Sequence, residues 1–449
     1  MAEKLFNSQH TQTAQIGRAN YSLCILMLAL LLILTATANA KTNLQQQLGS
    51  VSVISYGAKA DSKTDNTAAF QRALDAMSTK GGLVIVPSGT FLIKGSLTIP
   101  EGVTLQGVWQ APHNTTLGKG SFIFATGFAG DEKGTPLINL NPNSCIKGMT
   151  IFYPEQDPVN VKPYPWTIQG KGTNCSVIDV TLTNPYKGID FGTYTNELHY
   201  IRNVYGCPIR MGVYINKCYD IGRIENVHFQ SNAWTRSGFP NAPVGEKWQA
   251  LKKYIHENLE AFVFGRTDWE YVSGCFTIFP HIGFRFISVE NGPGNVLVSQ
   301  SGSDLCETAV QVDALQSHAG VEFSNCQFMS RVIIGPGNNG PVKFTNCGFW
   351  PINQTDNQAI IEGTGTVTFT ATHFAGWGAV DQQAPCIQLK SGSLIINGCE
   401  FMDKGKRQIE LGANTKSAAI FGSLFHGGEK IINNAPATAK VQIGLNIEE

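Results

Sequence analysis

A six-residue pattern recurs along most of this chain: an apolar residue, any residue, then Asn, Gly or Asp, then Val, Cys or a similar residue, any residue, and a second apolar residue. Copies start at Ile146, Val177, Ile224, Phe323, Phe344 and Ile396, with weaker copies at Ile201, Val272, Phe369 and Ile420. Successive starts lie about 24 residues apart, and the long gaps after Ile224 and Val272 are each close to two units. A fixed period of this length is typical of a solenoid, in which each unit packs against its neighbours.

The Asn or Gly at the third position of the pattern has a conformational reason. The apolar residues that flank it cannot both face the interior of one flat strand, but a single residue in the left-handed region turns the chain there. A second series of short alternating segments keeps step with the first: Gly188–Phe191, Gly212–Ile215, Gly283–Phe286, Ala309–Val312, Ala359–Glu362 and Gln408–Leu411. Such units bury an apolar face only by stacking, strand on strand, about 4.8 Å apart. Because helical periodicity is missing, the pattern predicts an all-β parallel β-helix rather than a helical repeat.

The fourth position of the pattern accounts for several of the eleven cysteines. Cys275, Cys326, Cys347 and Cys399 occupy it where other copies have Val, so we expect them to be small apolar residues of the core. A disulfide between neighbouring turns is geometrically awkward. The sequence has no C-x-x-C pair and no His spacing typical of a metal site, so we expect no metal and no cofactor.

The N-terminal segment has the features of an export signal. Basic residues precede an apolar run from Leu23 to Leu34, and Ala38-Asn39-Ala40 matches a cleavage site. The run is short for a transmembrane helix, and a signal anchor is the alternative. We therefore expect residues 1–40 to be a signal peptide and residues 41–449 to form one secreted or periplasmic β-helix domain, with no membrane association after cleavage. The 33 basic and 33 acidic residues balance, which argues against a nucleic-acid partner.

The beginning of the predicted domain resembles the pectate-lyase-like superfamily. The resemblance rests on Val53–Asp61, on Thr64–Ala73 and on Gly81–Phe91, with a helix that Asp65 would cap and that would run through Met77. It implies a single-stranded right-handed parallel β-helix with an N-terminal capping helix and a polysaccharide substrate. The Asn-Thr-Asp, Asp-Asp, Gly-His-Gly and Arg-Ile-Lys motifs of polygalacturonases do not occur, nor does the Trp-x-Asp-His segment of pectate lyases. The reaction is therefore not transferred by motif.

The repeat register suggests where the chemistry lies. Glu197, Asp220 and Asp268 each precede a pattern start by four residues, and Glu270 follows on the same strand as Asp268. Carboxylates about 5 Å apart would raise at least one pKa, and a protonated acid beside an ionised one is what glycosidic cleavage requires. These four acids are the candidate catalytic residues. Turn-forming acids and a calcium cluster are the alternatives.

Candidate substrate-binding residues surround these acids. Arg223 and Arg266 could hold an acidic sugar, and His228 flanks the Asn226 corner. The gap between Ile224 and Val272 contains an insertion at about residues 230–260, and long insertions in solenoids often form the binding side. Flat apolar faces for sugar rings would come from Trp234, Trp248 and Trp269.

Three functions are compatible with these features. The first is a glycoside hydrolase that uses two of the four carboxylates. The second is a polysaccharide lyase of pectate-lyase type, for which a basic residue would abstract a proton and calcium would be the cation. The third is a non-catalytic glycan-binding or structural β-helix. The expected partner is a polysaccharide or oligosaccharide, as the substrate of either enzyme or as the ligand of a glycan-binding protein.

Overall fold

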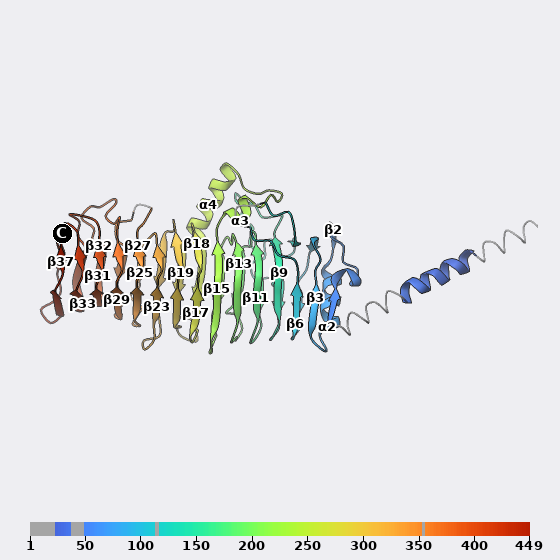
Figure 1. Cartoon of the computed structure of the whole chain (residues 1–449), viewed down its shortest axis with the longest axis horizontal. Helices are drawn as coiled ribbons and strands as arrows, with labels where there is room; N and C mark the ends of the chain where they lie inside the picture. Colours follow the sequence, from blue (N-terminus) through green and yellow to red (C-terminus); the bar gives the residue numbers. More distant parts are fainter. Residues whose placement is uncertain (1–22, 37–48, 113–115, 353–354) are drawn as a thin grey trace, which may run out of the picture.

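The computed structural model describes residues 23–36, 49–112, 116–352 and 355–449. From β1 onward the chain forms a parallel β-helix whose turns stack into a long rod (Figure 1). Strands pair only with the corresponding strands of neighbouring turns, which gives three ladders along the rod. The predicted fold class is confirmed.

The first ladder carries the six-residue pattern. Its strands are β1 (Ser50–Ser52), β3 (Gly82–Ile85), β6 (Val103–Gln106), β9 (Cys145–Phe152), β11 (Ser176–Leu182), β13 (Tyr200–Gly206), β15 (Gly222–Phe229), β17 (Glu270–Ser273), β20 (Val296–Ser299), β23 (Val321–Ser324), β26 (Val342–Thr345), β29 (Thr366–Thr370), β31 (Ile387–Asn397), β33 (Ile409–Phe421) and β36 (Lys440–Gly444). The predicted starts pair in register, as in Ile146 with Val177 and Val177 with Ile201.

Two further ladders complete each turn. The second contains β2 (Asp61–Asp65), β4 (Gly89–Ile93), β7 (Ser121–Ala125), the ends of β9 to β15, β18 (Phe276–Ile278), β21 (Gly302–Asp304), β24 (Gln327–Phe328), β27 (Gly348–Phe349), β30 (His373–Phe374), β32 (Glu400–Phe401), β34 (Leu424–Phe425) and β37 (Ile447–Glu448). The third contains β5 (Leu97–Ile99), β8 (Ile138–Leu140), β10 (Trp166–Gly170), β12 (Lys187–Phe191), β14 (Met211–Ile215), β16 (Glu260–Phe264), β19 (Ile282–Phe286), β22 (Thr308–Val312), β25 (Val332–Ile334), β28 (Ala359–Ile361), the beginnings of β31 and β33, and β35 (Ile431–Asn433).

The corner residue of the pattern adopts the predicted left-handed conformation. Asn203, Asn226 and Asn346 have φ of 51°, 52° and 52°. Side-chain amides also join neighbouring turns, since Asn226 Nδ2 donates to Asn203 Oδ1 at 2.8 Å and Asn346 Nδ2 donates to Asn325 Oδ1 at 2.6 Å. Asparagine therefore serves twice here, as a residue that tolerates the left-handed region and as a rung of a hydrogen-bonded ladder.

One of the two long gaps differs from the prediction. The gap after Val272 is two turns, because Val298 of β20 pairs with both Val272 and Phe323. The gap after Ile224 is a single turn, because β15 pairs directly with β17. Its extra length forms α3 (Asn232–Thr235) and α4 (Glu246–Asn258), which project from the side of the rod (Figure 1).

The N-terminal helix is present but begins later than predicted. After a short 3-10 helix, η1 (Val53–Tyr56), α2 (Thr67–Met77) lies at the N-terminal end of the stack and buries Phe70, Leu74 and Met77 (Figure 1). Its N-cap is Asn66 rather than Asp65, although the Asp65 carboxylate accepts from the Thr67 backbone N–H at 3.0 Å.

The pattern cysteines are confirmed as core residues. Cys275, Cys326, Cys347 and Cys399 are buried, and all eleven cysteines are free. Ser301, Thr372 and Ser423 are buried at the same position of other turns. The fourth position of the pattern therefore accommodates a small side chain, and a thiol is not required there.

Residues 23–36 of the apolar N-terminal run form an α-helix with exposed side chains. The predicted cleavage site Ala38–Ala40 lies outside the described residues. Within the described part of the chain, no helix has both the length and the apolar character needed to cross a membrane.

The left-handed corner predicts a difference between two substitutions of Asn346. Valine disfavours φ near 52° by about 1–2 kcal/mol and removes the hydrogen bond to Asn325, whereas glycine keeps the conformation. We expect Asn346→Val to lower the melting temperature clearly more than Asn346→Gly in circular dichroism. An equal decrease in melting temperature for the two variants would show that the left-handed conformation of Asn346 does not contribute to stability.

Candidate functional site

The predicted site lies where the chain enters three successive strands of the first ladder. Tyr200, Arg223 and Tyr271, at the beginnings of β13, β15 and β17, pair in register. A second set of bridges aligns Asn196, Cys218 and Thr267 a few residues earlier. The three turns therefore stack side by side at this corner, as the repeat predicted.

Within this corner the middle turn is one residue longer than its neighbours. Asn196 and His199 are three positions apart, whereas the aligned residues Cys218 and Gly222 are four positions apart. Counted back from the paired strands, Asp220 aligns with Glu197 and Asp268, as predicted; counted forward from Cys218, Tyr219 does. The backbones of Glu197 and Asp268 are two strand spacings apart, roughly 9–10 Å.

The acids before the strands face outward because a corner intervenes. Leu198 and Trp269, which directly follow Glu197 and Asp268, have left-handed φ values of 55° and 67°. This turn redirects the preceding side chains away from the interior, where strict alternation would have placed them. Asp220 is exposed, and Glu197 and Asp268 are half-buried.

Asp268 is held by a polar network. Arg266 Nη2 donates to Asp268 Oδ2 at 2.9 Å, and Gln316 Nε2 donates to Asp268 Oδ1. Asn295 extends this network, since its Nδ2 donates to Gln316 Oε1 and its Oδ1 accepts from the Trp269 backbone N–H at 3.0 Å. One oxygen of Asp268 is thus oriented by a side chain of its own turn, and the other by a side chain two turns further along. Repeat counting did not identify Gln316 or Asn295.

Exposed aromatic side chains surround the acids. Trp269 is 59% exposed and Tyr219 is 44% exposed. A bulky residue such as Trp269 rarely adopts a left-handed φ, and such strain often marks a functional position. The guanidinium of Arg266 lies 5.9 Å from the Tyr219 ring, and that of Arg223 lies 5.8 Å from the Tyr271 ring. The corner therefore presents aromatic faces, cations and carboxylates together.

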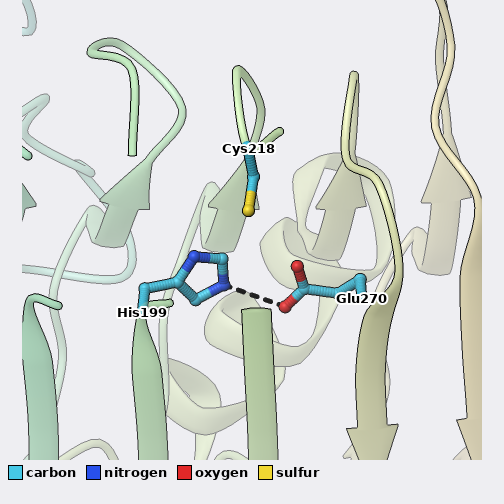
Figure 2. Close-up of side chains that lie close together, drawn as sticks. All are labelled: His199, Cys218 and Glu270. Carbon is cyan, nitrogen blue, oxygen red and sulfur yellow. Dashed lines mark hydrogen bonds and ion pairs between the residues drawn. The ribbon is translucent and has the colours of Figure 1, made fainter. Parts of the chain in front are cut away.

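Glu270 belongs to the interior and not to this surface. Its side chain and that of His199 are both 0% exposed, and His199 Nε2 lies 2.9 Å from Glu270 Oε1 (Figure 2). Glu270 shares the inward direction of Val272, two residues later on the same strand. The prediction that Glu270 is a catalytic acid is therefore wrong, because a polysaccharide cannot reach a side chain sealed inside the solenoid.

The contacts of His199 fix its orientation. Its Nδ1 lies 2.7 Å from Asn196 Oδ1, while Asn196 Nδ2 donates to the backbone carbonyls of Phe191, Tyr194 and Asn216. Because the amide nitrogen is committed to carbonyls, the amide oxygen must face the ring, and Nδ1 carries a proton. Burial opposes a charge on the ring, but Glu270, together with a hydrogen bond to Cys218, raises the pKa of His199 to about 10.

Gly222 and Cys218 complete this buried group. Gly222 lies in register between His199 and Glu270, and a Cβ there would clash with the His199 ring and the Glu270 carboxylate. The Cys218 thiol points toward the space between them (Figure 2). Ligand atoms of His199, Cys218 and Glu270 all lie within 4.8 Å of one another. No local motif in the sequence points to this group, because His199 and Glu270 are 71 residues apart.

The insertion supplies fewer sugar-facing rings than predicted. Trp234 is completely buried in a cluster with Leu251 and Ile255, so the prediction that it binds substrate is wrong. Trp248 is half-buried on α4, with Lys252 Nζ 5.2 Å from its ring. The cluster of Trp234, Leu251 and Ile255 attaches the insertion to the rod, where it packs with Phe152 and Ile209.

His228 belongs to a separate row of rings on the second ladder. Its ring lies 5.9 Å from that of Tyr205 and 5.0 Å from that of Phe276, and Trp109 extends the row at 5.9 Å from Tyr205. All four side chains are half-buried. The row could have been found from the sequence, since Tyr205, His228 and Phe276 each lie two residues after a corner residue.

The close contact over Gly222 predicts that this position does not tolerate a side chain. We expect Gly222→Ala to destabilise the chain by roughly 1–3 kcal/mol, because a methyl group would force apart a buried ion pair. Gly444→Ala on β36 is the matched control, since a Cβ there meets no atom within 4 Å. Urea denaturation followed by tryptophan fluorescence measures both. Similar urea midpoints for Gly222→Ala and Gly444→Ala would contradict the close packing of His199 and Glu270 around Gly222.

Comparisons with known proteins agree with the architecture. Residues 50–273 match a family model described as rhamnogalacturonase A/epimerase, pectate lyase-like. The tail spike protein of Shigella phage Sf6 is 24% identical over 143 residues, which cover 30% of this chain and 23% of that protein. The chain spans less than a quarter of the length of the curated relatives it matches.

Solved structures resemble the whole rod. The N-terminal fragment of bacteriophage phi29 gene product 12 has a TM-score of 0.63 at 11% identity, over 92% of this chain and 75% of that one. The catalytic unit of a GH87 α-1,3-glucanase from Streptomyces thermodiastaticus has a TM-score of 0.52 at 13% identity, over 88% of this chain and 70% of that one. At these identities the likeness concerns the fold.

Proposed function

Because this chain is a pectate-lyase-like parallel β-helix, we propose that it is an exported carbohydrate-active enzyme that hydrolyses a polysaccharide at the corner of Asp220 and Asp268. One observation carries the proposal: two solvent-accessible carboxylates from adjacent turns lie beside the exposed rings of Tyr219 and Trp269. A carbohydrate-cleaving site needs paired acids and flat apolar faces in the same place. The likeness to a glucanase and to a rhamnogalacturonase-type family model supports this substrate class.

The surroundings of the two acids suggest different roles. Asp268 is ion-paired with Arg266 and oriented by Gln316, so we assign it the role of base or nucleophile. Asp220 is exposed and forms no ion pair with any described residue, so the role of general acid is left to it. In hydrolysis the acid protonates the glycosidic oxygen as the bond to the sugar carbon breaks, and water supplies the hydroxyl group that replaces it. Glu197, half-buried on the preceding turn, is the alternative acid.

A polysaccharide lyase is the second candidate, and the arginines favour it. Arg223 is exposed on β15 and Arg266 is half-buried, so both could pair with the carboxylate of a uronic acid. A lyase would release a product with a carbon–carbon double bond, which absorbs in the ultraviolet, and calcium dependence would accompany it. A hydrolase gives neither signal.

Export is part of the same proposal. The apolar helix at residues 23–36 precedes the β-helix, and a polysaccharide substrate would be met outside the cytoplasm. N-terminal sequencing of the exported chain should then begin at Lys41, and an intact N-terminus would exclude cleavage.

Removal of either carboxylate should abolish most turnover. We expect Asp268→Asn and Asp220→Asn each to lower kcat by roughly 10²–10⁴-fold on whichever member of a polysaccharide panel is cleaved, as loss of a general acid or base does. Reducing-end release measures the rate, and ultraviolet absorbance of the product separates hydrolase from lyase. Glu410→Gln, on β33 far along the rod, is the matched control. Full activity of both Asp variants would exclude this corner.

Trp269 should contribute to substrate binding rather than to the chemical step. We expect Trp269→Ala to raise KM by about 2–10-fold with little change in kcat, because one aromatic contact contributes about 0.5–1.5 kcal/mol. Trp350→Ala is the control, since Trp350 is also partly exposed but lies several turns away. An unchanged KM for Trp269→Ala would remove this residue from the site.

A further inference from the structure

We propose that His199, Cys218 and Glu270 bind one divalent transition-metal ion, best matched by Zn²⁺, inside the solenoid beneath the acidic corner. The inference concerns a buried site distinct from Asp220 and Asp268, and it does not depend on the proposed hydrolase activity. Each ligand comes from a different turn, so the ion would join three neighbouring turns.

The three side chains offer the donor atoms that zinc prefers. Imidazole nitrogen, thiolate sulfur and carboxylate oxygen bind Zn²⁺ at about 2.0–2.3 Å. Around a tetrahedral ion such bonds place ligand atoms roughly 3–4 Å apart, and the three ligand atoms already lie within 4.8 Å of one another. Figure 2 shows that all three side chains converge, with the Cys218 sulfur above the gap between the imidazole and the carboxylate. The Cys218 thiol donates to the Asp220 backbone carbonyl at 3.0 Å, and it would give up this hydrogen bond when it binds the ion as a thiolate.

The surrounding hydrogen bonds hold two of the ligands in place. Asn196 Oδ1 accepts from His199 Nδ1–H, which leaves Nε2 directed at Glu270 and the centre of the group. Thr267 Oγ1 donates to Glu270 Oε2 at 3.0 Å, which leaves Oε1 directed at the same centre. A histidine that donates its second ring N–H to an oxygen, and a ligand carboxylate that is itself hydrogen-bonded, are the usual supports of a metal site.

The loaded site would be electrically neutral. Without an ion, the His199 imidazolium and the Glu270 carboxylate balance each other. When an ion binds, the imidazolium and the Cys218 thiol each release a proton, and the resulting thiolate, carboxylate and neutral imidazole carry two negative charges that a divalent cation neutralises. Isolated charges are costly to bury, and a buried ion pair regains that cost only with excellent geometry. All three residues are fully buried, and Gly222 leaves their centre free of any side chain. The site is therefore compact, neutral when loaded, and closed to solvent.

The direct test is metal content and cobalt spectroscopy of the full chain. The protein is expressed in medium supplemented with zinc or cobalt, purified, and dialysed against EDTA to remove ions from its surface. We expect about one equivalent of zinc per chain by mass spectrometry of the digested protein. In the cobalt form we expect a thiolate-to-cobalt charge-transfer band in the near-ultraviolet absorption spectrum.

Matched variants identify the ligands. We expect Cys218→Ser to lose the charge-transfer band, and His199→Gln or Glu270→Gln to lose most of the bound metal. Cys326→Ser, a buried cysteine several turns away, should keep both metal and spectrum. Wild-type protein that folds without bound zinc or cobalt, or a cobalt spectrum unchanged in Cys218→Ser, would overturn the proposal. Because neither readout needs a substrate, failure here is distinct from failure of the proposed hydrolase.

Discussion

The in-register stacking of turns is the constraint on which the rest of the structure depends. Each turn is too short to bury its own apolar residues, so its strands gain a core only by hydrogen bonding to equivalent strands above and below. A left-handed residue at the corner makes this compatible with the sequence, because it lets Ile224 and Phe229, on opposite sides of Asn226, both face inward. Small residues such as Cys326 fill the narrow place beside that corner.

Stacking also decides which polar residues meet. His199 and Glu270 are far apart in sequence yet form a hydrogen bond at 2.9 Å, because their turns flank the turn of Gly222 and glycine leaves the space between them open. At the same corner, two acidic residues that are two positions apart have opposite side-chain directions. Asp268 faces solvent and Glu270 is sealed inside, with the left-handed Trp269 between them. A buried charged group thus lies beneath an exposed acidic surface.

Single-residue differences between turns shape that surface. The middle turn has one residue more than its neighbours between Cys218 and Gly222, the segment that contains Asp220. The Asp220 side chain is exposed, whereas those of Glu197 and Asp268 are half-buried. Arg266 and Gln316 donate hydrogen bonds to Asp268 and not to Asp220, so the two carboxylates have unequal environments. Unequal environments are what a division into acid and base requires.

The repeat in the sequence was enough to predict the architecture, because units of about 24 residues with a left-handed corner bury their apolar positions by stacking. It located the pairing of Tyr200, Arg223 and Tyr271 and the core role of Cys275. The burial of Glu270 and Trp234, the extra residue in the turn of Asp220, and the convergence of His199, Cys218 and Glu270 appear only in the folded chain. The reason is physical: a repeat specifies which residues are equivalent, whereas the direction of a side chain depends on corners and inserted residues that local patterns do not encode.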